Sequence, residues 1–186
     1  MKRLFDISLS VSTLILMAIP MIIIALFVKL TTKGPVLYWS DRVGRNNILF
    51  RMPKFRTMSI NTPEVATNLL GDPDRYLTRI GCFLRKFSLD ELPQLLCILK
   101  GEMSFVGPRP ALFNQVDLIE LRTLKGVQHL IPGLTGWAQI NGRDELPLLI
   151  KVDFDEQYLK NYTFTLDLQI IFRTVIKVFK REGILH

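Results

Sequence analysis

The sequence predicts an α+β fold that is predominantly helical, and three observations lead to this prediction. A long apolar run without charge lies near the N-terminus, two short β-prone runs follow it, and an apolar stripe with helical spacing lies near the C-terminus. A length of 186 residues suits one compact domain plus a short additional segment. We therefore divide the chain into an apolar segment at 1–33 and a domain at 34–186, with amphipathic helices around its core.

The apolar segment has the length of a membrane helix. Residues 7–28 carry no charged side chain, and a straight α-helix over them would be about 33 Å long, enough to cross the hydrocarbon core of a bilayer. Pro20 removes a hydrogen bond in its middle and predicts a kink. The positive-inside rule favours neither end, because basic residues flank both: Lys2, Arg3, Lys29 and Lys33. These residues leave open a re-entrant hairpin bent at Pro20 and a kinked helix that spans the membrane.

Two β-prone runs, 36–39 and 48–51, are separated by glycine and asparagine and predict a β-hairpin. Residues 60–75 follow as a polar stretch punctuated by proline and glycine. Such a composition predicts a surface loop with at most one helical turn.

The C-terminal helix is predicted by apolar residues at three- and four-residue steps: Leu168, Ile171, Phe172, Val175, Ile176 and Phe179. Basic residues occupy the rest of its circumference: Arg173, Lys177, Lys180 and Arg181. A helix packed on the core with a solvated basic back is one interpretation. Beside a membrane segment, a helix that lies on anionic lipid is the other.

Composition excludes several functional classes. A net charge of +7 with 48% apolar residues suits an anionic membrane surface, whereas no basic tract or nucleic-acid module is present, so we expect no nucleic-acid partner. Two cysteines in apolar surroundings, Cys82 and Cys97, give no disulfide framework and favour a reducing compartment. His129 and His186 are too isolated to indicate zinc.

The densest chemistry lies at the acidic pair Asp90 and Glu91, with Arg85 and Arg109 nearby in the sequence. Adjacent carboxylates suit phosphoryl chemistry, because one can attack phosphorus while the other holds a metal or manages protons. The planar fork of guanidinium matches phosphate oxygens in bidentate geometry.

Helix capping is the alternative explanation of the same pair. Ser88 and Glu91 have the spacing of a capping box, and Asp90 could be a plain N-cap. Pro93 would then lie in the first turn of a helix over 92–99. Taken alone, these residues favour capping.

Five ordered motifs extend over nearly the whole chain. They lie at 2–6, 54–58, 88–94, 106–110 and 132–143. Together they resemble those of the monotopic phosphoglycosyl transferases, the bacterial sugar transferase family that primes O-antigen, capsule and glycoprotein glycans. The chain most resembles the small members, which have only the anchor and the catalytic domain.

The resemblance implies that Asp90 is the nucleophile, that Glu91 is its partner, and that Mg²⁺ binds at this pair. Asp90 would attack the β-phosphate of a UDP-sugar, expel UMP and become a sugar-phosphoryl aspartate. Polyprenyl (undecaprenyl) phosphate would then accept the sugar phosphate, in ping-pong order. The competing function, from another class, is a non-catalytic membrane anchor or assembly factor in which Asp90 only caps a helix.

Further substrate contacts are also implied by the resemblance. The expected cationic frame around the phosphates is Lys54, Arg85, Arg109 and Arg143, although each could be an exposed ion-pairing residue. Two acidic positions resemble acidic sites of the family, Asp155 and Asp167, and could bind substrate or pair with nearby Lys and Arg. Trp137 could stack on uracil or lie in the core.

Location is the last implication of the resemblance. A helix broken near Pro20 would re-enter the bilayer, keep both ends cytoplasmic, and hold the catalytic domain at the cytoplasmic face of the bacterial inner membrane among its phospholipids. The family usually has Ser before this proline, where the present chain has Ile19. A homo-oligomer and the identity of the sugar are left open.

Overall fold

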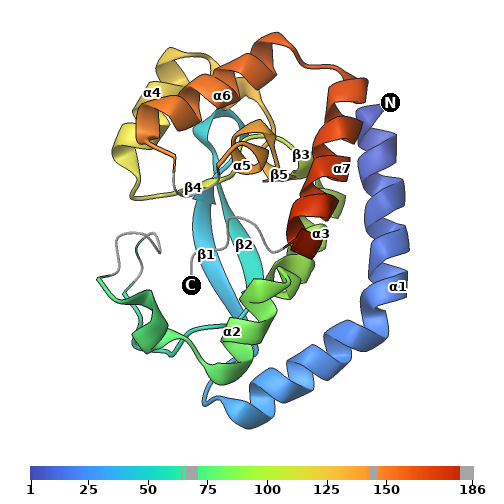
Figure 1. Ribbon diagram of the computed structural model, residues 1–186, viewed down its shortest axis with the longest axis vertical. Coiled ribbons are helices and arrows are strands. Elements are labelled where there is room, and N and C mark those ends of the chain that lie inside the picture. The colour runs from blue at the N-terminus through green and yellow to red at the C-terminus, as the bar shows by residue number, and fades with distance from the viewer. Residues whose placement is uncertain (64, 66–70, 143–145, 181–186) are drawn as a thin grey trace.

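The computed structural model of the chain describes residues 1–63, 65, 71–142 and 146–180 (Figure 1). It is mostly helical with a few short strands, which confirms the predicted α+β class at that level. Figure 1 shows two strands at the centre, helices around them, and the N-terminal helix along one edge of the molecule.

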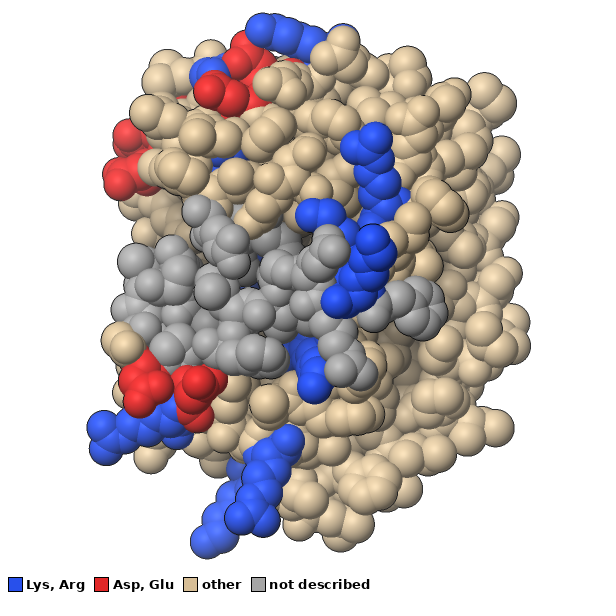
Figure 2. All heavy atoms as spheres, viewed as in Figure 1, with Lys and Arg blue, Asp and Glu red and all other residues tan. Residues whose placement is uncertain are grey.

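Helix α1 (Lys2–Thr31) contains Pro20, as the sequence predicts, and Figure 1 shows it bent partway along its length. Among the described residues it is the one helix long and apolar enough to cross a membrane. Its middle carries exposed apolar side chains, since Ile15, Leu16 and Ile19 are 72–73% exposed. Figure 2 shows no Lys, Arg, Asp or Glu at the right edge of the molecule, where α1 lies in Figure 1. Such an exposed apolar surface is typical of a segment that contacts lipid.

The N-terminal end of α1 is held to the domain by polar contacts. The Lys2 ammonium lies 2.6 Å from a carboxylate oxygen of Asp167. Arg3 donates to two carbonyls at the end of α3 (Leu95–Lys100). Asp6 is buried and accepts a hydrogen bond of 2.8 Å from Ser104.

The C-terminal end of α1 packs on the same domain through apolar contacts. Ile24 and Val28 form a buried cluster with Phe55 and Leu84. Just beyond the helix, the Thr32 hydroxyl accepts a hydrogen bond of 2.5 Å from the guanidinium of Arg56, which follows strand β2. The two ends of α1, on either side of the bend, therefore contact the same domain.

The predicted hairpin is confirmed, with longer strands than the sequence indicated. Strand β1 (Leu37–Val43) pairs antiparallel with β2 (Leu49–Phe55) across a turn at η1 (Arg45–Asn47). The short strand β4 (Ala111–Leu112) adds to the other edge of β1. A second small sheet pairs β3 (Ser104–Val106) parallel with β5 (Gly133–Thr135).

The described part of the polar stretch after β2 includes the short helix η3 (Pro73–Tyr76), while residues 64 and 66–70 lie outside the described residues. Helix α2 (Arg79–Lys86) follows. The helix expected over 92–99 is wrong as a single element, because the run divides into the 3₁₀ helix η4 (Leu89–Gln94) and α3. Pro93 explains the division, since its nitrogen has no hydrogen to donate to an α-helical bond.

The remaining described helices form the upper part of the domain in Figure 1: α4 (Val116–Leu124), η5 (Val127–His129), α5 (Trp137–Ile140), α6 (Leu148–Lys160) and α7 (Phe164–Lys180). The main core cluster joins residues of β2, α3, β3, α6 and α7, including Met52, Ile98, Phe105, Tyr158 and Ile170. Figure 1 shows α7 beside the part of α1 that precedes its bend.

The C-terminal helix is confirmed, but its predicted apolar stripe does not all face the core. Ile170, outside that stripe, is fully buried. Leu168, Phe172 and Val175 are 42%, 67% and 47% exposed and recur on one side of α7. The exposed row fits the interpretation of a helix that lies on lipid better than that of a helix packed wholly on the core.

Candidate active site

The acidic pair lies at a sharp corner between two helices. Helix α2 ends at Lys86, and Ser88 adopts a left-handed backbone conformation with φ 54°. That conformation is uncommon for a residue other than glycine. Asp90 and Glu91 are the second and third residues of η4, which begins after this turn.

The capping interpretation of this corner is wrong. Ser88 precedes η4 but makes no side-chain cap hydrogen bond. A capping serine normally has an extended backbone, and the left-handed turn at Ser88 does not provide it. Asp90 lies inside η4 and not before it. The acidic pair is therefore not accounted for by helix capping.

Lys54 reaches the pair from strand β2, which packs against η4. Its ammonium lies 2.7 Å from Glu91 Oε1 and 4.0 Å from Asp90 Oδ2. Asp90 is buried, with 6% of its surface exposed. Burial raises the pKa of Asp90, and the positive charge of Lys54 opposes that rise.

Arg109 approaches Glu91 from the loop between β3 and β4. Its Nη2 lies 3.2 Å from the same carboxylate oxygen that Lys54 contacts. The backbone carbonyl of Arg109 accepts a hydrogen bond of 2.8 Å from Arg122 in α4. Two side chains predicted as cations of the site, Lys54 and Arg109, are thus brought together on one carboxylate.

Arg85 lies on α2, directly before the corner. Its Nε donates to the Thr57 hydroxyl at 3.0 Å, and its charge lowers the pKa of Asp90. Gly81 permits this arrangement, because a Cβ there would lie 1.9 Å from the Thr57 carbonyl oxygen. Close packing of α2 against the segment after β2 therefore places a third cation near the pair.

Asp155 has a buried protein partner. Its side chain on α6 is 1% exposed, and Oδ2 accepts hydrogen bonds of 2.9 and 2.6 Å from Nε and Nη2 of Arg122. Burial raises the pKa of Asp155, while Arg122 opposes that rise. The structure places this carboxylate in a buried ion pair that supports the Arg109 loop through Arg122, and not at the acidic pair.

Asp167 also has protein partners. This carboxylate on α7 is 2% exposed and accepts hydrogen bonds of 2.6 Å from both Lys2 and the Tyr158 hydroxyl. Burial and this hydrogen bond raise the pKa of the Tyr158 phenol. The arrangement ties α1, α6 and α7 together, so the structure gives Asp167 a structural contact.

Two predicted contacts remain, Arg143 and Trp137. Arg143 lies outside the described residues. Trp137 is partly buried against the main core, its Nε1 donates to Gln157 at 3.2 Å, and Arg173 lies 5.9 Å above its ring. The core interpretation therefore fits Trp137 better than stacking on a base.

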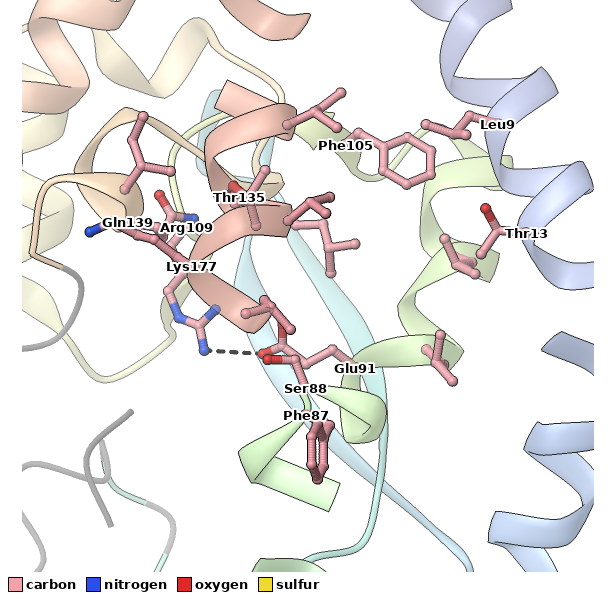
Figure 3. A pocket seen from close by; sticks show the side chains of 18 residues that line it. Leu9, Thr13, Phe87, Ser88, Glu91, Phe105, Arg109, Thr135, Gln139 and Lys177 are labelled. Atoms are coloured by element: carbon pink, nitrogen blue, oxygen red, sulfur yellow. Dashed lines mark hydrogen bonds and ion pairs between the residues drawn. The ribbon is translucent and has the colours of Figure 1, made fainter. Parts of the chain in front are cut away.

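A cavity of about 380 Å³ opens beside the pair (Figure 3). Its polar part contains Ser88, Glu91 and Arg109 with Gln139 and Lys177, and the opposite part is apolar and reaches α1. Figure 3 shows Leu9, Thr13 and Phe105 at that apolar part. The cavity that the described residues form is lined by Glu91 and not by Asp90, which is the more buried of the two.

The sequence did not identify the contributions of Leu9, Gln139 and Lys177 to this cavity. Leu9 belongs to the apolar segment, whose uniform composition marks no position as special. Gln139 lies in the glycine-rich run 132–143, and glycines there were the available signal that backbone approaches a ligand closely.

The acidic pair offers two adjacent carboxylates to a cation. Among the described residues there is no group of three or more His, Cys, Asp or Glu side chains that could hold a metal. Mg²⁺ commonly uses one or two carboxylates and completes its shell with water and substrate phosphates. The donor set at Asp90 and Glu91 fits that pattern of magnesium binding.

Comparison with known proteins agrees with this chemistry. A family model described as bacterial sugar transferase matches residues 1–181. An undecaprenyl-phosphate galactose phosphotransferase of Salmonella typhimurium is 39% identical over 98% of this chain and 41% of its own length. An uncharacterized sugar transferase of Bacillus subtilis, EpsL, is 41% identical over 99% of this chain and 90% of its own length.

A third relative is a UDP-N-acetylgalactosamine-undecaprenyl-phosphate N-acetylgalactosaminephosphotransferase of Aeromonas hydrophila. It is 37% identical over 98% of this chain and 44% of its own length. The chain thus spans less than half of the Salmonella and Aeromonas relatives and most of EpsL.

Proposed function

Because the chain belongs to the bacterial sugar transferase family, we propose that it transfers a sugar-1-phosphate from a UDP-sugar to polyprenyl (undecaprenyl) phosphate. The observation that carries the proposal is the acidic pair, with Lys54 and Arg109 bound to it, beside a cavity that runs to the apolar helix α1. The product would start a bacterial glycoconjugate at the membrane. Relatives named for such transfers support the acceptor class.

In the first step, a carboxylate oxygen of Asp90 attacks the β-phosphorus of the UDP-sugar. The bond from this phosphorus to the bridging oxygen of the α-phosphate breaks, and UMP leaves with the electron pair. Donor phosphates would draw Lys54 and Arg109 away from Glu91, because phosphate oxygens compete with the carboxylate for the same charge-assisted hydrogen bonds. That exchange opens the way to the buried Asp90.

In the second step, a phosphate oxygen of the polyprenyl phosphate attacks the phosphorus held by Asp90, and the aspartyl oxygen leaves as a carboxylate. The apolar part of the cavity suits the first isoprene units, since Leu9, Leu95 and Phe105 line it. Arg109 and Lys177 line the polar part and can neutralise the acceptor phosphate.

Mg²⁺ fits this proposal as the resident cation, with Asp90 and Glu91 as its protein ligands. When bound, it would supply positive charge to the oxygens of the donor diphosphate. Lys54, Arg85 and Arg109 supply protein charge to the same region. Together these charges offset the repulsion between an anionic nucleophile and an anionic donor.

For the membrane, we propose that α1 re-enters the cytoplasmic face of the bacterial inner membrane and does not span it. Support comes from its two ends, since Lys2 bonds to Asp167 while Val28 packs against Leu84 of the same domain. A spanning helix would have to separate one of these contacts from the domain by the thickness of a bilayer. The exposed apolar row of α7 would lie on the same surface.

Labelling of cysteines at both ends of α1 tests this topology. In a Cys82→Ser background, a cysteine inserted directly after the exposed Met1 and Lys33→Cys should each resist a membrane-impermeant maleimide in intact spheroplasts and react once the membrane is opened. Cys97 is buried and provides little background. Reaction at exactly one end before opening would show a spanning helix and contradict the proposal.

Release of UMP tests the proposed reaction directly. We expect the purified protein in detergent, with Mg²⁺ and polyprenyl phosphate, to release UMP from one or a few donors in a panel of UDP-sugars. Absence of UMP release from every donor would contradict the proposal.

A further inference from the structure

The side-chain amide of Gln139 has no protein partner in the cavity wall. Gln139 is 8% exposed and lines the cavity, yet both Oε1 and Nε2 are without a hydrogen-bond partner among the described residues. An unmet buried amide costs free energy, because folding removes its hydrogen bonds to water. Such a group at a cavity wall indicates a ligand that completes the bonds.

Backbone contacts place the segment that carries Gln139 beside the Arg109 loop, and Gly136 leaves room for the amide. Gly136 lies so close that a Cβ there would be 2.6 Å from Gln139 Oε1. The loop before it is bound to the Arg109 loop, since Gly133 N donates to the Pro108 carbonyl and Gly107 N to the Thr135 carbonyl, each at 2.9 Å. The segments that carry Gln139 and Arg109 are therefore bonded to each other at the polar part of the cavity (Figure 3).

The hydrogen-bonding groups of the amide indicate which part of the substrates it can bind. Gln139 must both donate and accept a hydrogen bond to be satisfied. Phosphate oxygens without a proton only accept, and isoprene units do neither. A pair of sugar hydroxyls, or an acetamido substituent with its N–H and carbonyl, supplies both partners.

Connectivity of the donor points to the same group. The sugar is joined to the β-phosphorus through a single oxygen, whereas uracil is separated from it by the α-phosphate and ribose. A sugar phosphate bound near Glu91 and Arg109 therefore brings its ring to their shared cavity wall. The same ring stays there after UMP leaves, because the proposed intermediate keeps the sugar on the phosphorus.

We infer that Gln139 binds the sugar of the donor. The inference rests on the proposed function and names the part of the substrate that this side of the cavity binds. Gln139 acts as a binding residue beside the reacting atoms, and the backbone bonds between its segment and the Arg109 loop place it at the polar part of the cavity.

Gln139→Met tests the inference, because methionine keeps the length of the side chain and removes both hydrogen-bonding groups. We expect kcat/KM for UMP release from the preferred UDP-sugar to fall about 10- to 100-fold, the loss typical of one or two hydrogen bonds to a substrate. A deoxy analogue that lacks the bonded hydroxyl, or a deacetylated analogue, should lose activity with the unmodified protein and lose little more with Gln139→Met.

Gln157→Met is the matched control, since Gln157 is an exposed amide on α6 that bonds Trp137 outside the cavity. It should leave the order of preference among UDP-sugars unchanged. Thermal unfolding of each variant in detergent checks that the fold is retained.

Three outcomes with Gln139→Met would overturn the inference. An equal loss with every UDP-sugar, together with weaker inhibition by UMP, would place Gln139 at the uridine. A raised KM for polyprenyl phosphate alone would place it at the acceptor, and unchanged kinetics would leave it no role in binding. If the unmodified protein releases no UMP, the proposed function itself fails, which separates that result from these three.

Discussion

Asp90→Asn is expected to abolish UMP release, with a loss of about 10,000-fold or more in the first half-reaction, because a neutral amide cannot serve as the attacking oxygen. The same substitution should also prevent a sugar-phosphate adduct on the protein. Rapid quenching and mass spectrometry of the intact chain would detect that adduct in the unmodified protein. UMP release is measured in parallel with the preferred donor.

Stability separates this outcome from simple unfolding. Asp90 is buried and its pKa is raised, so burial already disfavours its charge. An uncharged asparagine of the same shape should therefore keep the midpoint of thermal unfolding close to that of the unmodified protein. Asp153→Asn is the control, because the Asp153 carboxylate is 53% exposed and pairs with Lys125 on the surface. UMP release by a folded Asp90→Asn protein would rule out Asp90 as the nucleophile.

Local periodicity predicted the hairpin and the C-terminal helix correctly, because each depends on near neighbours in the chain. Strands β1 and β2 are joined by one short turn. The spacing of apolar residues in α7 is a property of that helix alone. Neither pattern reveals which neighbours cover the element, and for this reason the exposed row of Leu168, Phe172 and Val175 could not be told from a core stripe.

The acidic corner was harder to predict, since its conformation is decided by one backbone residue. Ser88 and Glu91 have the spacing of a capping box, and the left-handed φ of Ser88 prevents that motif from forming. No property of a serine side chain predicts this conformation. The family resemblance identified the pair, and the structure added the contacts of Lys54 and Arg109 with Glu91.

The cavity depended on contacts between distant parts of the chain. Leu9 on α1, Glu91 on η4 and Gln139 on α5 meet there, although the sequence separates them widely. Packing of α1 against α3, together with pairs such as Lys2 with Asp167 on α7, brings the apolar helix to the polar site. Such tertiary contacts have no signature in the periodicity of either helix.

The role of Asp155 leads to the second large effect that we expect. Arg122→Met should lower the free energy of unfolding by about 3–5 kcal/mol, because it leaves the Asp155 carboxylate buried without its partner. It should also loosen the Arg109 loop, whose carbonyl accepts a hydrogen bond from Arg122. Chemical denaturation in detergent measures the change. Lys125→Met is the control on the same helix end, and loss of its surface pairs should leave the denaturation midpoint close to that of the unmodified protein.

A double variant, Arg122→Met with Asp155→Leu, decides between the two interpretations of Asp155. Replacing a buried ion pair by apolar residues is often neutral or stabilising, so most of the lost stability should return. If Asp155 serves only the ion pair with Arg122, the folded double variant should keep UMP release within about 10-fold of the unmodified protein. The remaining loss would arise because the Arg109 loop has lost its hydrogen bond from Arg122. If Asp155 binds substrate instead, stability will return while KM for the UDP-sugar rises steeply, and the structural role assigned to this carboxylate will be incorrect.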